Sequence, residues 1–258
     1  MKPDSKRTAP LDFRRVTNLI RTLLSQAGVD RSYAKVFAIG FNKTGTSSIN
    51  SVFASTGLGS LHSTRWNKPG QARLLYLHQA FSDGSEIDFA SLDRRFPRSK
   101  FILNVRDLDE WLDSRIEHIR HTSEIGIHSD TGNWAISDAA VTSWIRQRNV
   151  HHLAILDYFA DRPADLLVVN FIRADDSAAR IRSFLGRPGS DNKPHTRPIP
   201  VTRFAGILRN PDMIANCLSR LGIPQPEWKT DIYCPSLESA NIGAKWPSDT
   251  ARMPKAAA

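Results

Sequence analysis

Short apolar runs alternate along this chain with segments in which apolar residues recur every three or four positions. The first run, rich in β-branched and aromatic residues, spans 35–41, and similar runs cover 101–105 and 165–171. Runs of this kind are typical of strands buried on both faces, as in a parallel sheet. A further short strand is expected at 60–63.

Helical periodicity separates these strands. It predicts helices over 46–56, 108–121 and 136–159. Strands that alternate with helices indicate βαβ units, so we expect an α/β fold with a mainly parallel sheet and helices on both faces. In the helix over 136–159, Trp144 and the aliphatic residues, Val150 among them, are expected to pack in the core rather than bind a cofactor.

The pattern predicts one domain over residues 1–258, with a core at about 35–200. Residues 1–30 show the periodicity of a leading amphipathic helix. Residues 186–200 are rich in proline, glycine and polar side chains and are predicted to form a long loop. Residues 203–258 follow no pattern that predicts an element.

Composition narrows the class of protein. The chain has 258 residues, of which 40% are hydrophobic, enough to bury a core and exclude wholesale disorder. Its apolar runs are shorter than the roughly 18–20 residues of a membrane helix, and no secretory signal is expected. Cys217 and Cys234 fit neither a disulfide scaffold nor a zinc site. We therefore expect free thiols and a cytoplasmic protein.

The charge is strongly basic. Lys and Arg number 35 against 26 Asp and Glu, a formal net charge of +9 with a pI near 9.9. Over half of the excess lies between residues 173 and 209, which hold eight basic and three acidic side chains. Nucleic acid, an anionic membrane surface, an anionic small ligand and a merely solvated basic face all fit this balance.

The segment with clear chemistry is Gly40-Phe41-Asn42-Lys43-Thr44-Gly45-Thr46-Ser47-Ser48, between a predicted strand and a predicted helix. Two glycines five positions apart match the first part of a phosphate-binding loop, which holds an anion through backbone N–H groups and a helix N-terminus. We therefore expect an oxyanion here.

The loop departs from the ATP-binding pattern. Thr46 follows the second glycine, where the Walker pattern has lysine, and the lysine lies inside the loop at Lys43. The strand over 101–105 leads into Arg106, where an acid that holds magnesium would be wanted. These departures favour an anion site without a metal.

The loop Lys43–Ser48 resembles the 5′-phosphosulfate loop of the sulfotransferases that use 3′-phosphoadenosine 5′-phosphosulfate (PAPS). Residues Lys100–Asp107, followed by Trp111 and Ser114, are similar to the strand and helix with which that family binds the 3′-phosphate. Residues 158–186 resemble its late strand and helix. The branch with a "KTGT" loop is the most similar.

The resemblance covers roughly residues 36–195. It implies a three-layer, P-loop-NTPase-like fold with a central, mainly parallel sheet flanked by helices. It also implies transfer of a sulfuryl group from PAPS to a hydroxyl or amine, with 3′-phosphoadenosine 5′-phosphate (PAP) as product and no metal. Carbohydrate, lipid, peptide and small phenol all stay open as acceptors, and no nucleic acid partner is expected.

The resemblance also implies a set of donor-binding residues: Asn42, Lys43, Thr44, Gly45, Thr46, Ser47, Ser48, Arg106, Ser114, His195 and Arg197. Lys43 would stabilise the leaving group, and Arg106 with Ser114 would bind the 3′-phosphate. Other interpretations remain at this level: Thr46 or Ser47 as a plain helix cap, and Arg106 in an ion pair with a neighbouring Asp107 or Asp109.

Two residues are candidates for the general base that activates the acceptor. Asp83 follows a segment placed like the family's early strand, although Gly84-Ser85 departs from the usual Asp-x-Pro. His62 follows the strand at 60–63. A helix cap near Ser85 and a histidine at a strand end are the respective alternatives.

Two other functions fit the same residues. A P-loop nucleotide kinase would need magnesium, and a non-catalytic nucleotide- or polyanion-binding protein would bind without turnover. The adjacent His151 and His152 are not expected to bind metal, because neighbouring helical residues point in different directions.

Overall fold

The computed structural model describes residues 34–84, 87–124, 136–187 and 207–237. The predicted leading helix of residues 1–30 lies outside the described residues, as does most of the predicted loop over 186–200.

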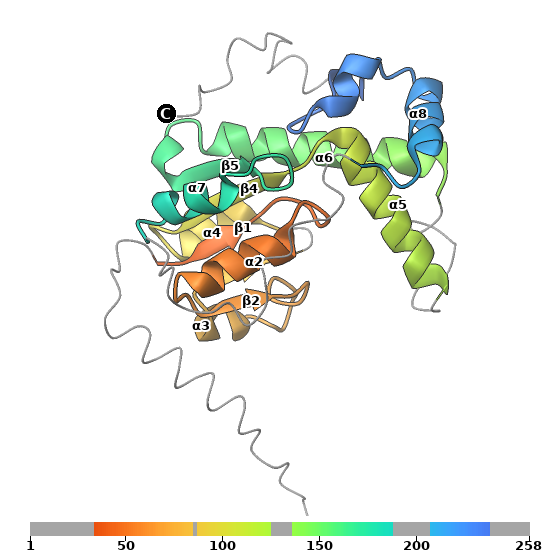
Figure 1. Cartoon of the computed structure of the whole chain (residues 1–258). Helices are drawn as coiled ribbons and strands as arrows, with labels where there is room; N and C mark the ends of the chain where they lie inside the picture. Colours follow the sequence, from red (N-terminus) through yellow and green to blue (C-terminus); the bar gives the residue numbers. More distant parts are fainter. Residues whose placement is uncertain (1–33, 85–86, 125–135, 188–206, 238–258) are drawn as a thin grey trace, which may run out of the picture.

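The described strands form one parallel sheet in the order β2-β3-β1-β4-β5 (Figure 1). The strands are β1 Val36–Ala38, β2 Ser60–His62, β3 Ala80–Ser82, β4 Lys100–Val105 and β5 Leu166–Asn170. The α/β class and the parallel sheet predicted from the sequence are confirmed. The first strand is shorter than the predicted 35–41, because the chain leaves the sheet at Gly40 after the Ile39 amide donates to the Ile102 carbonyl at 2.9 Å.

Helices cover both faces of the sheet. They are α2 Thr46–Ser55, α3 Leu74–Leu77, α4 Phe89–Arg95, α5 Leu108–Glu124, α6 Asp138–Tyr158, α7 Ser177–Phe184 and α8 Pro211–Arg220. Short 3-10 turns lie at Pro163–Asp165, Gln225–Lys229 and Pro235–Leu237. The predicted helices over 46–56, 108–121 and 136–159 are confirmed within two or three residues at their ends.

Alternation along the strands produces the layers, because successive side chains point to opposite faces. Val36 and Ala38 pack with α2 and α7. Phe37 and Ile39 pack with α4 and the carboxyl-terminal part of α6. Trp144 is buried as predicted, whereas Val150 is exposed because it lies on the outer face of α6.

A second hydrophobic cluster lies beyond the sheet edge. It joins α5, the first half of α6 and α8, and its buried residues include Trp111, Trp144, Ile214 and Leu218. Helix α8 belongs to the region after residue 203 that the sequence pattern left unassigned. Cys217 and Cys234 are both buried free thiols in this cluster, as predicted.

The segment after α8 returns to the carboxyl edge of the sheet. The Thr230 carbonyl accepts from the Leu108 amide at 3.0 Å, and the Cys234 amide and carbonyl both bond the Asn149 side chain at 2.8 Å. We call residues 230–234 the return segment. Among the described helices, none is long and apolar enough to cross a membrane.

Candidate functional site

The loop after β1 is fixed by its two glycines. The Gly40 amide donates to Asn104 Oδ1 at 2.9 Å, and a Cβ at Gly40 would lie 1.9 Å from the Asn104 carbonyl oxygen. Gly45 has φ 88°, the left-handed region that glycine adopts without a steric penalty. The glycine spacing that the sequence analysis noted therefore corresponds to a close approach at one end and a turn at the other.

Side chains from α5 and from Arg106, which follows β4, hold the carbonyls of the loop. Trp111 Nε1 donates to the Asn42 carbonyl at 3.1 Å, and Arg106 Nη1 donates to the Lys43 carbonyl at 3.1 Å. The Thr44 hydroxyl is buried, donates to the Phe41 carbonyl and accepts from the Asn104 amide. Thr44 therefore uses its hydroxyl to stabilise the loop, and only its backbone N–H is left to contact a ligand.

Helix α2 begins at the end of this loop with no side-chain cap. Its N-cap is Gly45, which has no side chain, and its first turn holds no acidic residue. The interpretation of Thr46 or Ser47 as a plain cap is therefore wrong. Thr46, Ser47 and Ser48 form a first turn whose N–H groups and helix dipole favour an anion.

Lys43 lies within the loop in a left-handed conformation, with φ 66°. Burial lowers the pKa of its ammonium group; the charge of Asp83 opposes this shift, and the charges of Arg106 and Arg209 add to it. The positive charges of Lys43, Arg106 and Arg209 are therefore close enough to affect one another. Arg209 was missed as a site residue, and the sequence signal for it was the basic excess between 173 and 209.

His62 and Asp83, alternatives at the level of sequence, lie together beside the first turn of α2. Thr46 Oγ1 donates to Asp83 Oδ1 at 3.3 Å, and His62 Nε2 lies 3.1 Å from Ser47 Oγ and 3.8 Å from Asp83 Oδ2. The other ring nitrogen, Nδ1, is 3.0 Å from Ser82 Oγ. The ends of the adjacent strands β2 and β3 bring the two groups together.

Asp83 is not a helix cap. Helix α4 begins at Phe89, and its cap is Asp88, whose Oδ1 accepts from the Ser91 amide at 2.8 Å. Asp83 has φ 64°, a strained value for a residue with a side chain. Such strain is common where a side chain must point into a site.

Asp83 corrects the prediction that the acid of a magnesium site is absent. That prediction rested on Arg106 after the strand over 101–105, yet β1 has two neighbours in the sheet, β3 and β4. Asp83 directly follows β3 and bonds Thr46 in the first turn of α2. A carboxylate therefore does follow a strand next to β1, which removes one of the two arguments against a kinase.

Arg106 forms an ion pair with Glu110 at 3.3 Å, one turn into α5. The predicted alternative pairing with Asp107 or Asp109 is wrong. Ser114, half-buried, follows Glu110 by one further turn and so lies on the same side of α5. Glu110 and Ser114 therefore share one face of α5, and Arg106, which precedes the helix, contacts this face through Glu110.

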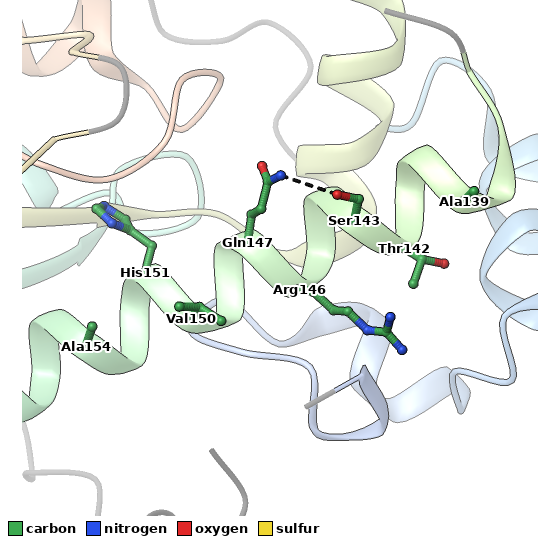
Figure 2. A pocket seen from close by; sticks show the side chains of 8 residues that line it. All are labelled: Ala139, Thr142, Ser143, Arg146, Gln147, Val150, His151 and Ala154. Carbon is green, nitrogen blue, oxygen red and sulfur yellow. Dashed lines mark hydrogen bonds between the residues drawn. The ribbon is translucent and has the colours of Figure 1, made fainter. Parts of the chain in front are cut away.

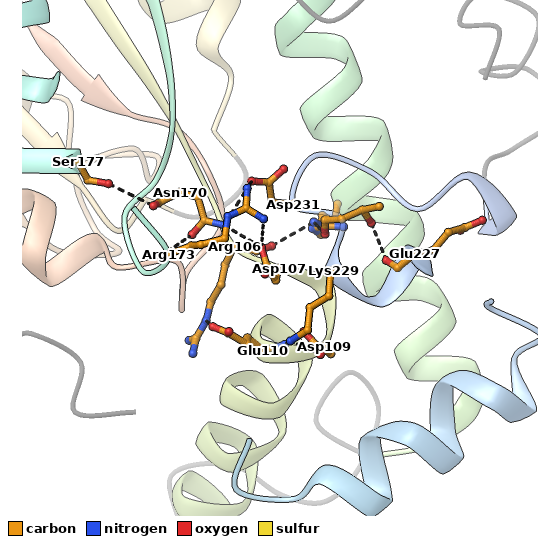
Figure 3. A network of polar contacts seen from close by, with 12 residues as sticks. Arg106, Asp107, Asp109, Glu110, Asn170, Arg173, Ser177, Glu227, Lys229 and Asp231 are labelled. Atoms are coloured by element: carbon orange, nitrogen blue, oxygen red, sulfur yellow. Dashed lines mark hydrogen bonds and ion pairs between the residues drawn. The ribbon is translucent and has the colours of Figure 1, made fainter. Parts of the chain in front are cut away.

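A polar network anchors the strand ends behind Arg106 (Figure 3). Asp107 Oδ1 accepts from Asn170 Nδ2 at 2.9 Å and pairs with Arg173 at 3.0 Å, and Arg173 also pairs with Asp231 of the return segment at 2.7 Å. Burial raises the pKa of Asp107, while the charge of Arg173 acts in the opposite direction. A second pair, Lys229 with Asp109 at 2.8 Å, adds to this anchoring.

A groove of about 760 Å³ follows the outer face of α6 (Figure 2). His151, at one end, lies 5.1 Å from Phe41 between ring centres and 2.6 Å from the Ile39 carbonyl. Gln147 and His151 point to one side of the helix and Arg146 to the other. Because these polar groups diverge, they do not point toward one common position, in contrast to the groups around the loop.

Two predicted donor-binding residues, His195 and Arg197, lie outside the described residues. The structure places other predicted site residues in the loop, at the start of α2 or at the strand ends beside them. These residues are Asn42, Lys43, Gly45, Thr46, Ser47, Ser48, Arg106, His62 and Asp83. In the described parts of the chain, no three His, Cys, Asp or Glu side chains gather as a metal site would require.

Comparison of the chain with models of known protein families gives no match, and comparison with curated proteins gives none. The fold and the site define an α/β protein whose central strand leads through a glycine-bounded loop into an uncapped helix.

Proposed function

We propose that the chain is a sulfotransferase that moves a sulfuryl group from PAPS to a hydroxyl or amine. The observation that carries this proposal is the arrangement around the loop. Lys43 and the uncapped start of α2 offer a site for a 5′-phosphosulfate, and Arg106, 3.1 Å from the Lys43 carbonyl, offers a guanidinium for a second phosphate. One ligand with two separate anionic groups fits this pair of sites.

The reaction is an in-line displacement. The acceptor oxygen or nitrogen forms a bond to sulfur while the bond from sulfur to the bridging oxygen breaks, and its electrons pass to the 5′-phosphate of PAP. Lys43 and the α2 amides stabilise the negative charge that develops there. The step needs no redox partner.

The acceptor proton passes to Asp83 in this proposal. The Asp83 carboxylate is held by Thr46 at 3.3 Å and stands 3.8 Å from His62, beside the first turn of α2 where the sulfuryl group would bind. His62 positions this carboxylate and is itself held by Ser82 and Ser47. A base next to the transferred group is what proton removal from the acceptor requires.

The proposal is tested by calorimetric binding of PAP without magnesium, compared with AMP and ATP. We expect PAP to bind at least tenfold more tightly than AMP. Arg106→Ala should reduce this preference at least tenfold, because the bond from Arg106 to the extra phosphate is charge-assisted. Arg94→Ala, an exposed arginine on α4, is the matched control and should leave binding unchanged.

Tighter binding of ATP than of PAP, or binding that requires magnesium, would contradict the sulfotransferase proposal. Preference for PAP that survives in the Arg106 variant would contradict the role of Arg106. Binding of PAP with no transfer from PAPS to any hydroxyl would favour a non-catalytic nucleotide-binding protein.

A P-loop phosphotransferase is the second candidate, and Asp83 is the observation that favours it. An acid after the strand adjacent to β1, bonded to the first turn of α2, is placed where such enzymes hold magnesium. Thr46 in place of the Walker lysine weighs against it. Magnesium-dependent ATP binding that Asp83→Asn abolishes would support this candidate over the sulfotransferase.

A further inference from the structure

Arg115 is a cation beside the loop that the proposed mechanism does not use. It lies on α5, with its guanidinium 4.5 Å from the centre of the Trp144 ring and 5.8 Å from that of Trp111. Its Nη1 lies 3.5 Å from Asn42 Oδ1. Its Nε is buried and has no hydrogen-bond partner.

Arg115 is poorly compensated for a partly buried cation. In the described parts of the chain it forms no ion pair with a carboxylate, whereas Arg106 pairs with Glu110 and Arg173 pairs with two aspartates. Burial lowers its pKa to about 10, which still leaves it charged at neutral pH. Stacking on tryptophan offsets part of the lost hydration, but an unpaired buried charge remains unfavourable.

A purely structural role explains Arg115 poorly. Its bond to Asn42 is at the outer limit for a hydrogen bond, and Trp111 already holds the same residue by its carbonyl at 3.1 Å. Arg148 also forms no ion pair and also has one unbonded nitrogen, Nη1, but it differs because its Nη2 donates to two backbone carbonyls, at 2.9 and 3.2 Å. Arg148 therefore has the bonds of a structural arginine, and Arg115 lacks them.

We propose that Arg115 binds an oxyanion of the ligand on the Asn42 side of the loop. The oxyanion is either a phosphate of the donor nucleotide or an anionic group of the acceptor, since phosphate, sulfate and carboxylate all suit a guanidinium held by two tryptophans. This inference rests on the proposed function and adds an anion-binding residue to it. If the oxyanion belongs to the acceptor, the acceptor is an anionic compound.

The test is a charge series at position 115: Arg115→Lys, Arg115→Gln and Arg115→Met. Each variant is titrated with PAP, and the PAP-saturated chain is then titrated with inorganic sulfate, followed by tryptophan fluorescence. Arg146→Met, an exposed arginine on α6, is the control for net charge. Thermal unfolding of each variant shows whether it is folded.

A loss of at least tenfold in PAP affinity in the Gln and Met variants, with the Lys variant between them and the wild type, indicates the donor phosphate. Unchanged PAP affinity with weaker sulfate binding to the complex indicates the acceptor side. Affinities of the variants for PAP and for sulfate that stay within twofold of the wild type overturn the inference. Losses of affinity that follow the unfolding temperature of each variant, and not the charge at position 115, overturn it as well.

Failure of the proposed function would be distinguishable from failure of this inference. If the wild type does not prefer PAP to AMP, the sulfotransferase proposal fails, and the same series is then titrated with inorganic pyrophosphate. Weaker pyrophosphate binding in the Gln and Met variants would still support Arg115 as an oxyanion-binding residue. Equal binding would overturn it.

Discussion

At the scale of single residues, Lys43 combines three features that an ordinary surface lysine lacks. It has a left-handed backbone, its carbonyl is held by Arg106, and burial lowers the pKa of its ammonium group. A positive φ in a residue with a side chain is uncommon and unfavourable. The loop therefore fixes the backbone at Lys43, and the ammonium group that it carries is partly removed from solvent.

The lowered pKa of Lys43 predicts a pH dependence. A bound anion favours the charged ammonium, so PAP affinity should fall as the pH rises through the lowered pKa, before the 10.5 of an ordinary lysine is reached. PAP binding measured from pH 7 to pH 10 checks this. Lys43→Met should bind more weakly and lose this fall.

The lowered pKa of Lys43 also makes the stability of the fold depend on pH, in the direction opposite to that of PAP affinity. The folded chain releases the Lys43 proton at a lower pH than the unfolded chain does, so the unfolded chain binds more protons between the lowered pKa and 10.5. The contribution of Lys43 to the free energy of unfolding therefore rises with pH across that window.

For PAP binding, a fall of affinity with pH that persists unchanged in Lys43→Met would contradict the assignment of that fall to Lys43.

At the scale of elements, the long periodic segments and the short strand β2 were predictable, whereas β3 and α8 do not follow from a pattern. Helix α6 and strand β4 follow from their patterns because each buries a regular set of apolar residues. Strand β3 has three residues, too few for a period, although Asp83 after it was found by resemblance. Helix α8 was missed because it is short and lies in a proline-rich stretch: Pro211 is its first residue and Pro224 follows it, so the spacing of Ile214 and Leu218 was not interpreted as helical.

The candidate site was predictable where it is local in sequence and unpredictable where it depends on the sheet order. The loop and its glycines follow from one stretch of sequence. Contacts such as Thr46 with Asp83 and the charge of Arg209 near Lys43 depend on which strands and helices become neighbours. The sequence pattern predicts the strands but does not specify the order in which they pair.

The strand-to-loop junction makes a prediction at this scale. Gly40→Ala should destabilise the fold by about 3 kcal/mol or more, because its Cβ would overlap the Asn104 carbonyl oxygen at 1.9 Å. Gly57→Ala is the matched control. It has φ 79° and open space around it, so only the backbone penalty of about 1–2 kcal/mol applies. Chemical denaturation measures both, and equal costs would contradict the close approach at Gly40.

At the scale of the whole molecule, the described chain packs on both faces of the sheet and in a separate cluster beyond the sheet edge. The sheet holds the loop, while α5, α6 and α8 form the second cluster. Helix α5 belongs to the second cluster and links it to the loop, since it follows β4 closely and its Trp111 and Arg115 contact Asn42. The second cluster therefore supports one wall of the candidate site.

This arrangement predicts that a change in α8 affects the whole fold. Ile214→Ala removes a buried side chain between α8 and α5 and should lower the free energy of unfolding by about 2–5 kcal/mol. Ile207→Ala, at an exposed isoleucine, should change it by less than about 0.5 kcal/mol. Calorimetric unfolding should show a single transition for both variants, and a separate early transition for Ile214→Ala would contradict the coupling.

The order of the strands also affects how the chain folds as it is synthesised. Among the described strands, β1 pairs with β3 Ala80–Ser82 and with β4 Lys100–Val105. The ribosome adds about 5–20 residues per second, so roughly 3–13 s pass between the synthesis of β1 and the synthesis of β4, its second neighbour in the sheet. During that interval the apolar residues 36–39 have no completed sheet to pack in. The strand that carries the candidate site is therefore a segment that a chaperone can bind in the nascent chain.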